Sequence, residues 1–162
     1  MKAQIWSLDL SVSVTIFLTV IVAFLFTFNL LSADASRQSE LFSMQDAALE
    51  ITEALVRSPG LPQGWTNTTV QAIGLAEKEN VLNESKVLFF LSLDYNQSKV
   101  LLSLTASQYL FQLEHPNSSL WTLQGQNITK GLNYTGALDV VSVERYALLQ
   151  GKPARLRFLL WR

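Results

Sequence analysis

Residues 10–33 read LSVSVTIFLTVIVAFLFTFNLLSA, an apolar run of 24 residues that contains no charged side chain. An α-helix rises about 1.5 Å per residue, and the hydrocarbon core of a bilayer is roughly 30 Å thick. The run is therefore long enough to cross a membrane. A buried core helix is the alternative, but a helix that is apolar on all sides needs a much larger protein to cover it. Residues 4–33 are thus predicted to form a transmembrane helix.

The composition of the 162-residue chain excludes several classes of protein. Only 15% of the residues are charged and the net charge is −1, which argues against a disordered chain and against a nucleic-acid-binding protein. The absence of cysteine removes disulfides, thiol nucleophiles and cysteine-ligated metals, and a single histidine, His115, cannot supply two imidazole ligands. We therefore expect no enzyme activity, no cofactor and no metal site.

The flanks of the apolar run predict its orientation. Lys2 and the terminal amine are the positive charges on the short side, so the N-terminus is expected in the cytoplasm and the rest of the chain outside the cell. The expected location is the cell membrane, with a single pass. Cleavage as a secretory signal near Ala35 is the alternative, although the run is longer than the usual signal core.

Asparagine-linked glycosylation sites give independent support for export. Six of the eight asparagines stand in N-x-S/T sequons, which are glycan acceptors on the non-cytoplasmic side of the membrane. The alternative is a polar surface without sugar. The six are Asn67, Asn83, Asn96, Asn117, Asn127 and Asn133.

The helix is predicted to continue beyond the membrane, because no glycine or proline occurs before Pro59. Apolar residues then recur at spacings of three and four, as on one face of an amphipathic helix. That face is formed by Leu41, Met44, Ala48, Ile51 and Leu55. One helix is therefore expected from about Gln4 to about Val56, and residues 34–58 form its extramembrane half.

Residues 59–162 are predicted to form a small extracellular α+β domain. SPGLPQGW ends the long helix, Val70–Ala76 is expected to be extended, and Ser85 is a candidate cap for a short helix over Lys86–Leu93, which equally fits a buried strand. Ser98–Leu104 is a second short element of either kind.

The C-terminal part of this domain is predicted to be an antiparallel β-sheet. The expected strands cover residues 109–114, 119–124, 139–149 and 154–161, and the last two flank a hairpin loop, Gln150–Pro153. Such a sheet has one apolar face that needs a cover, and the amphipathic half of the long helix is the candidate. The predicted fold class is therefore α+β.

The sequence offers few residues for chemistry. His115 lies in a predicted turn, where a solvated histidine is expected, and Glu114 should point to the opposite face of its strand. Arg155, Arg157 and Lys152 are expected on a solvated sheet face. The tryptophans Trp65, Trp121 and Trp161 are expected in the core or an interface.

The overall layout resembles type IV pilins. A short charged leader, Met1–Ala3, precedes the apolar run, as in the class III signal sequences of archaeal prepilins, and the stretches SPGLPQGW, IGLA and VVSVERYALL are similar to archaeal pilin-like surface proteins. The resemblance implies cleavage between Ala3 and Gln4 by a prepilin peptidase. It also implies assembly with copies of itself or related pilins, by the pilus machinery, into a surface filament.

Asp9 is the residue to which the resemblance gives a role in subunit assembly. In pilins an acidic side chain near the mature N-terminus neutralises the terminal amine of the adjoining subunit. Asp9 would be the sixth residue after cleavage, whereas the family usually has a glutamate at the fifth, and one position rotates a side chain by about 100° around the helix. The alternative function is a single-pass surface or adhesion glycoprotein that does not polymerise.

Overall fold

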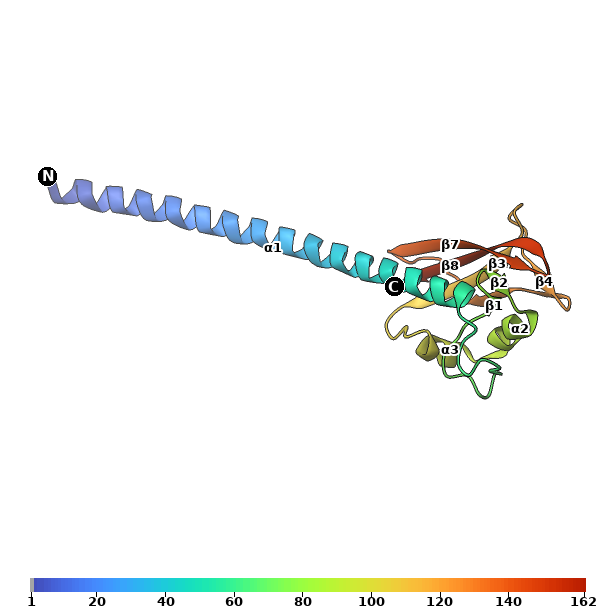
Figure 1. The fold of residues 1–162 in the computed structure, drawn as a ribbon. Helices are drawn as coiled ribbons and strands as arrows, with labels where there is room; N and C mark the ends of the chain where they lie inside the picture. The colour runs from blue at the N-terminus through green and yellow to red at the C-terminus, as the bar shows by residue number, and fades with distance from the viewer. Residues whose placement is uncertain (1) are drawn as a thin grey trace. The chain divides into compact units, whose positions relative to one another are not determined.

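The computed structural model describes the backbone of residues 2–162 and the side chains of residues 8–32, 35 and 37–162. The chain divides into two compact units, Met1–Glu40 and Leu41–Arg162, which are described separately. One helix, α1 (Lys2–Arg57), begins in the first unit and ends in the second (Figure 1). The predicted helix, from about Gln4 to about Val56, is therefore confirmed to within a residue or two at each end.

The second unit contains a six-stranded sheet with the order β1-β2-β7-β8-β3-β6. Its strands are β1 (Ala76–Lys78), β2 (Val81–Leu82), β3 (Gln108–Glu114), β6 (Thr129–Gly131), β7 (Val140–Leu149) and β8 (Lys152–Trp161). The strands β4 (Thr122–Leu123) and β5 (Gln126–Asn127) form a separate two-stranded sheet. The α+β class is confirmed.

The predicted C-terminal strands β3, β7 and β8 pair antiparallel, as expected, but the whole sheet is mixed, because β2 pairs with β7 in parallel. The register places Val81 opposite Leu148 and Leu82 opposite Leu149. A strand of two residues has too little alternation to be predicted from sequence, so this parallel pair escapes pattern analysis. All other strand pairs are antiparallel.

Two short helices settle the ambiguous stretches. α2 (Glu84–Ser92) is capped by Asn83, whose side chain accepts a hydrogen bond from the Lys86 amide, and not by Ser85 as expected. α3 (Tyr95–Leu101) is capped by Asp94.

Two predicted strands are wrong for most of their length. In Val70–Ala76 only Ala76 belongs to a strand, and Ala72 makes an isolated bridge to Leu61. In 119–124 the strand is confined to β4, because the positive φ angles of Gln124 and Gly125 turn the chain directly after it.

The amphipathic end of α1 lies in the core of the second unit. Met44, Ala48, Ile51 and Leu55 are buried and Leu41 is half-buried, as the spacing predicts. Met44, Ala48, Ile51 and Leu55 share one cluster with α2 and the inner face of the sheet, including Phe111, Leu156 and Phe158 from the strands. The helix is therefore the predicted cover of the apolar sheet face.

The turn after α1 requires glycine at two positions that approach each other. Gly60 has a φ of +77°, and a Cβ on Gly74 would lie 2.4 Å from the Gly60 amide nitrogen. The Trp65 indole closes this turn by donating to the carbonyls of Pro59 (3.1 Å) and Gly74 (3.0 Å). The SPGLPQGW and IGLA stretches therefore form one packed corner.

Candidate functional site

The first unit is an apolar helix whose described side chains are exposed. From Leu8 to Leu31 its large hydrophobic residues, such as Ile16, Phe24 and Leu30, are each more than one-third exposed. Burying this surface would release about 25 cal/mol for each Å² removed from water. Within Leu8–Arg57 the helix is long and apolar enough to cross a membrane.

Polar side chains within the apolar run are bonded to the helix itself. The hydroxyls of Thr15, Thr19 and Thr27 each donate to the carbonyl four residues earlier, at 2.8–2.9 Å, and the Asn29 amide donates to Leu25 in the same way. In hydrocarbon an unpaired hydroxyl or amide donor is costly. These bonds therefore leave the three threonine hydroxyls and the Asn29 amide paired within the helix.

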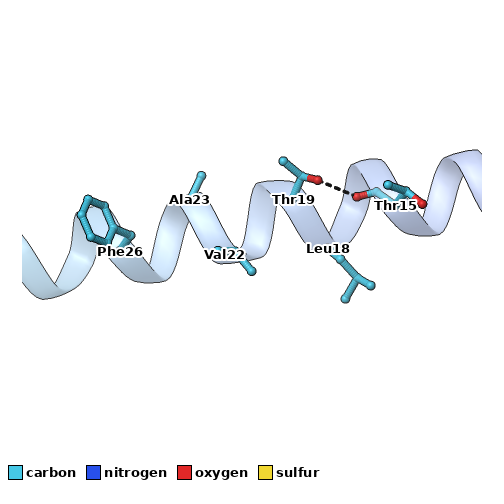
Figure 2. Close-up of a pocket in the computed structure, with 6 residues that line it drawn as sticks. All are labelled: Thr15, Leu18, Thr19, Val22, Ala23 and Phe26. Carbon is cyan, nitrogen blue, oxygen red and sulfur yellow. Dashed lines mark hydrogen bonds between the residues drawn. The ribbon is translucent and has the colours of Figure 1, made fainter.

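One side of this helix has a shallow groove. It is lined by Thr15, Leu18, Thr19, Val22, Ala23 and Phe26. Figure 2 shows Thr19 and Ala23 pointing to the same side of the helix, one turn apart, with Phe26 at one end. Small side chains at such spacing let a second helix approach closely. The groove is therefore the part of the apolar surface with the shape of a helix-packing face.

Asp9 is the first acidic residue of the chain, and its side chain is exposed on α1. It lies at the N-terminal border of the apolar run, where the resemblance gives it a role in assembly. The predicted cleavage between Ala3 and Gln4 concerns side chains outside the described residues, as does Met1 of the leader. Of the residues predicted for cleavage and subunit assembly, Asp9 has its side chain among the described residues.

Five of the six sequon asparagines are exposed, and Asn83 is half-buried at the start of α2. The Asn117 side chain accepts hydrogen bonds from the amide and hydroxyl of Ser119, which makes a compact turn. In the Asn96 sequon the Ser98 hydroxyl is buried and bonds the Tyr109 hydroxyl at 2.5 Å. The structure therefore separates five accessible asparagines from Asn83, whose side chain also caps a helix.

His115 and Glu114 contact different partners. The His115 ring is half-exposed and stacks on Trp121, with ring centroids 4.1 Å apart, so it is less solvated than expected. Glu114 is buried and paired with Arg155. Among the described residues, no group of three or more His, Asp or Glu side chains could hold a metal ion.

The two arginines of β8 are also less solvated than expected. Arg155 donates to Glu114 and to the Ser118 hydroxyl, and it lies 3.7 Å from Glu144. Arg157 lies 3.8 Å from the other Glu114 oxygen. Hydrogen bonding to Glu114 raises the pKa of Arg155, so this cation is fixed in an ion-pair network on the outer sheet face. Lys152 is exposed, as predicted.

Trp65, Trp121 and Trp161 are buried, as predicted for core residues. Two lysines, Lys86 and Lys130, are buried although no sequence pattern predicts it. The Lys86 ammonium donates to the carbonyls of Pro59 (2.8 Å) and Ala76 (3.1 Å), and the Lys130 ammonium donates to Leu91 (3.2 Å) and Leu93 (2.5 Å) at the end of α2. Burial lowers the pKa of both side chains. Each joins segments that are distant in sequence, which gives it a structural role.

Comparison of the chain with protein-family models, with curated proteins and with solved structures found no match.

Proposed function

We propose that the protein is a structural subunit, major or minor, of a type IV pilus-like surface filament of archaeal type, and not an enzyme. Its apolar segment would anchor the unassembled chain in the membrane and would then pack against copies of itself. A prepilin peptidase would first remove Met1–Ala3. The glycosylated second unit would lie on the outside of the cell and of the filament.

The continuity of α1 is the single observation that carries this proposal. One helix, Lys2–Arg57, contains both an uncharged apolar segment and a stripe that is buried in a folded domain. A removable signal peptide or a simple anchor has no need to share a helix with the domain that follows. A filament subunit does need one helix shared by its apolar segment and its folded domain, because this helix connects the packed core of the filament to the surface domains.

Two further features support packing between copies of the helix. The groove around Ala23 offers small and β-branched side chains at close spacing, and the threonine hydroxyls that line it are already bonded to the backbone. Two such helices can pack without leaving these hydroxyls unpaired. Asp9 would supply a negative charge near the N-terminal ends of the helices, which the filament would bury. The terminal amine of the next subunit would be its partner there.

Substitutions at Asp9 test this proposal in the native host. Asp9→Asn removes the charge and keeps the shape, so the yield of filaments in the sheared surface fraction should fall at least tenfold, while the chain still inserts in the membrane. Asp9→Glu should retain filaments. Asp46→Asn, at an exposed position in the second unit, is the matched control and should behave as wild type. Normal filaments from Asp9→Asn would contradict the assigned role of Asp9, and the absence of filaments from the wild type would contradict the function.

A non-polymerising surface or adhesion glycoprotein is the second candidate. The five exposed sequon asparagines favour it, because dense sugar suits any exported surface domain. An intact N-terminus that retains Lys2, with no sheared fibres, would decide for this candidate.

A further inference from the structure

Glycan transfer to a sequon requires two side chains at once. The N-x-S/T pattern includes a hydroxyl two residues after the asparagine, so the transferase must contact that hydroxyl as well as the asparagine amide. In an extended chain the side chains of residues i and i+2 lie on the same face. In an α-helix the same two side chains are rotated by about 200° around the axis and point to nearly opposite sides. One enzyme site can therefore hold an extended sequon, but not a helical one.

The Asn96 sequon is helical in the folded chain. Asn96 and Ser98 both belong to α3, and the Ser98 amide donates to the Asp94 carbonyl at 2.9 Å. Asn96 is exposed, whereas Ser98 has no exposed surface. The two groups that a transferase needs therefore lie on opposite sides of the helix, one in solvent and the other in the core.

The Ser98 hydroxyl is held in the core by its neighbours. It donates to the Tyr95 carbonyl (2.7 Å) and shares a hydrogen bond with the hydroxyl of the fully buried Tyr109 (2.5 Å). The Tyr95 ring stacks on Tyr109, with ring centroids 5.1 Å apart, and Tyr109 stacks in turn on Phe158 of β8. Because α3 must leave β3 before a second protein can reach this hydroxyl, exposing Ser98 means unfolding this part of the core.

The Asn133 sequon has the opposite geometry. Asn133, Tyr134 and Thr135 are all exposed and lie in the connection between β6 and β7, outside the helices and strands. Among the described residues, no backbone carbonyl accepts a hydrogen bond from the amides of these three residues. Tyr134 has an edge contact with Trp161, at 6.3 Å between ring centroids, which involves neither the Asn133 amide nor the Thr135 hydroxyl. This stretch can therefore present both groups to an enzyme while the domain stays folded.

We propose that the folded second unit accepts a glycan at Asn133, whereas Asn96 accepts one only before α3 packs on β3. In this reaction the asparagine amide nitrogen bonds to the first carbon of a sugar, the bond from that carbon to a lipid-linked phosphate breaks, and the amide releases one proton. The fold thus determines when each sequon can be modified. A glycan on Asn96 records transfer to the unfolded chain, and a glycan on Asn133 can be added before or after folding.

Glycan transfer in the cell rests on the proposed function, because that function places the second unit on the outer side of the membrane. Filament assembly is not required. The folded and unfolded chains differ as acceptors whether or not filaments form, so a cell-free assay separates the two questions.

Glycan transfer in vitro to the full chain tests this difference. The Thr135→Ser variant, in which both sequons end in serine, is prepared without sugar in detergent micelles. It is incubated with a purified oligosaccharyltransferase that accepts the bare N-x-S/T sequon and with its lipid-linked sugar donor. Mass spectrometry gives the initial rate at each asparagine, and the fluorescence of the buried tryptophans verifies that the chain is folded. Two peptides, residues 92–100 and 129–137, are the matched controls for the reactivity of each sequon without a fold.

The ratio of the Asn133 rate to the Asn96 rate is the deciding quantity. A folded domain exposes its core in about one molecule in a thousand or fewer, so this ratio should be at least roughly tenfold higher in the folded chain than between the two peptides. A ratio within about threefold of the peptide ratio, or no transfer to Asn133 in the folded chain, would overturn the proposal. A chain that never forms filaments would leave the expected ratio unchanged, so failure of the filament and failure of this proposal are distinguishable.

Discussion

Leu55→Ala tests whether the second half of α1 forms the core of the second unit. Leu55 is fully buried in the apolar stripe of the helix. Shortening it to alanine removes three carbon atoms from the core, which costs about 2.4 kcal/mol in transfer free energy at 0.8 kcal/mol for each CH₂. The cavity that remains adds to this loss, so we expect the free energy of unfolding to fall by about 3–4 kcal/mol.

Thermal unfolding of the full chain in detergent measures this loss. The indole rings of Trp65, Trp121 and Trp161 are buried in the second unit, so their fluorescence reports its unfolding. At about 4 °C for each kcal/mol in a domain of this size, the midpoint should fall by roughly 12–16 °C. Phe42→Ala is the matched control on the same helix, since Phe42 is 64% exposed. A midpoint shift below about 2 °C for Leu55→Ala, or equal shifts for the two variants, would refute the packing of this helix half on the sheet.

Three other predictions concern the same domain. Asn83→Ala should cost about 1 kcal/mol of stability, because it removes the α2 cap, whereas Asn83→Asp should keep the cap. Both variants lose the sequon, so they are compared without sugar. Equal stability of the two variants in an unglycosylated preparation would contradict the capping role. Lys130→Met should lose about 1–2 kcal/mol, because the carbonyls of Leu91 and Leu93 lose their donor, and an unchanged urea midpoint would show that these bonds contribute nothing. Burial raises the pKa of the Tyr109 hydroxyl above its ordinary value near 10. Above about pH 10 this tyrosine therefore ionises in the unfolded chain but not in the folded one, which favours unfolding. The stability that the neutral hydroxyl contributes is thus complete below about pH 10 and is lost as the pH rises further. Tyr109→Phe should remove this loss, which reaches about 1.4 kcal/mol per pH unit, and parallel stability curves for the two proteins between pH 10 and 11 would argue against it.

Local patterns predicted the long helix, because its signal is contained in neighbouring residues. The apolar run and the spacing of Leu41, Met44, Ala48, Ile51 and Leu55 specify a helix and its buried face without reference to the rest of the chain. The two long C-terminal strands were predicted for a similar reason, although the turn between them is only Gln150–Gly151 and Lys152 already belongs to β8.

The remaining features depend on contacts that sequence spacing does not specify. Lys86 bonds a carbonyl 27 residues away, and Lys130 bonds carbonyls 37 and 39 residues away, so neither lysine differs in sequence from an exposed one. The parallel pair of β2 and β7 likewise depends on a long connection between Leu82 and Val140. Ser85 was the predicted cap of α2, whereas the structure has Asn83 in this place. Both residue types cap helices well and lie two positions apart, so the sequence does not distinguish them.

Some features of the candidate site could be predicted from the sequence and others could not. Composition alone predicts a helix that is long and apolar enough to cross a membrane, and the exposure of Asp9 agrees with its place at the border of the apolar run. The groove around Ala23 and the burial of the Ser98 hydroxyl were not predicted, because both depend on which side chains the fold leaves uncovered. The cleavage between Ala3 and Gln4 remains a prediction from the resemblance to prepilins.

Mass spectrometry of the protein from a sheared surface fraction of its host tests the proposed function most directly. The account predicts a mature chain that begins at Gln4, retains the apolar helix and carries sugar on several of the six sequon asparagines. A chain that begins at Met1 would contradict prepilin processing and leave a membrane-anchored surface module. A chain that begins between Asp34 and Ser36 would show that the apolar run is a removed signal peptide, and would contradict the filament.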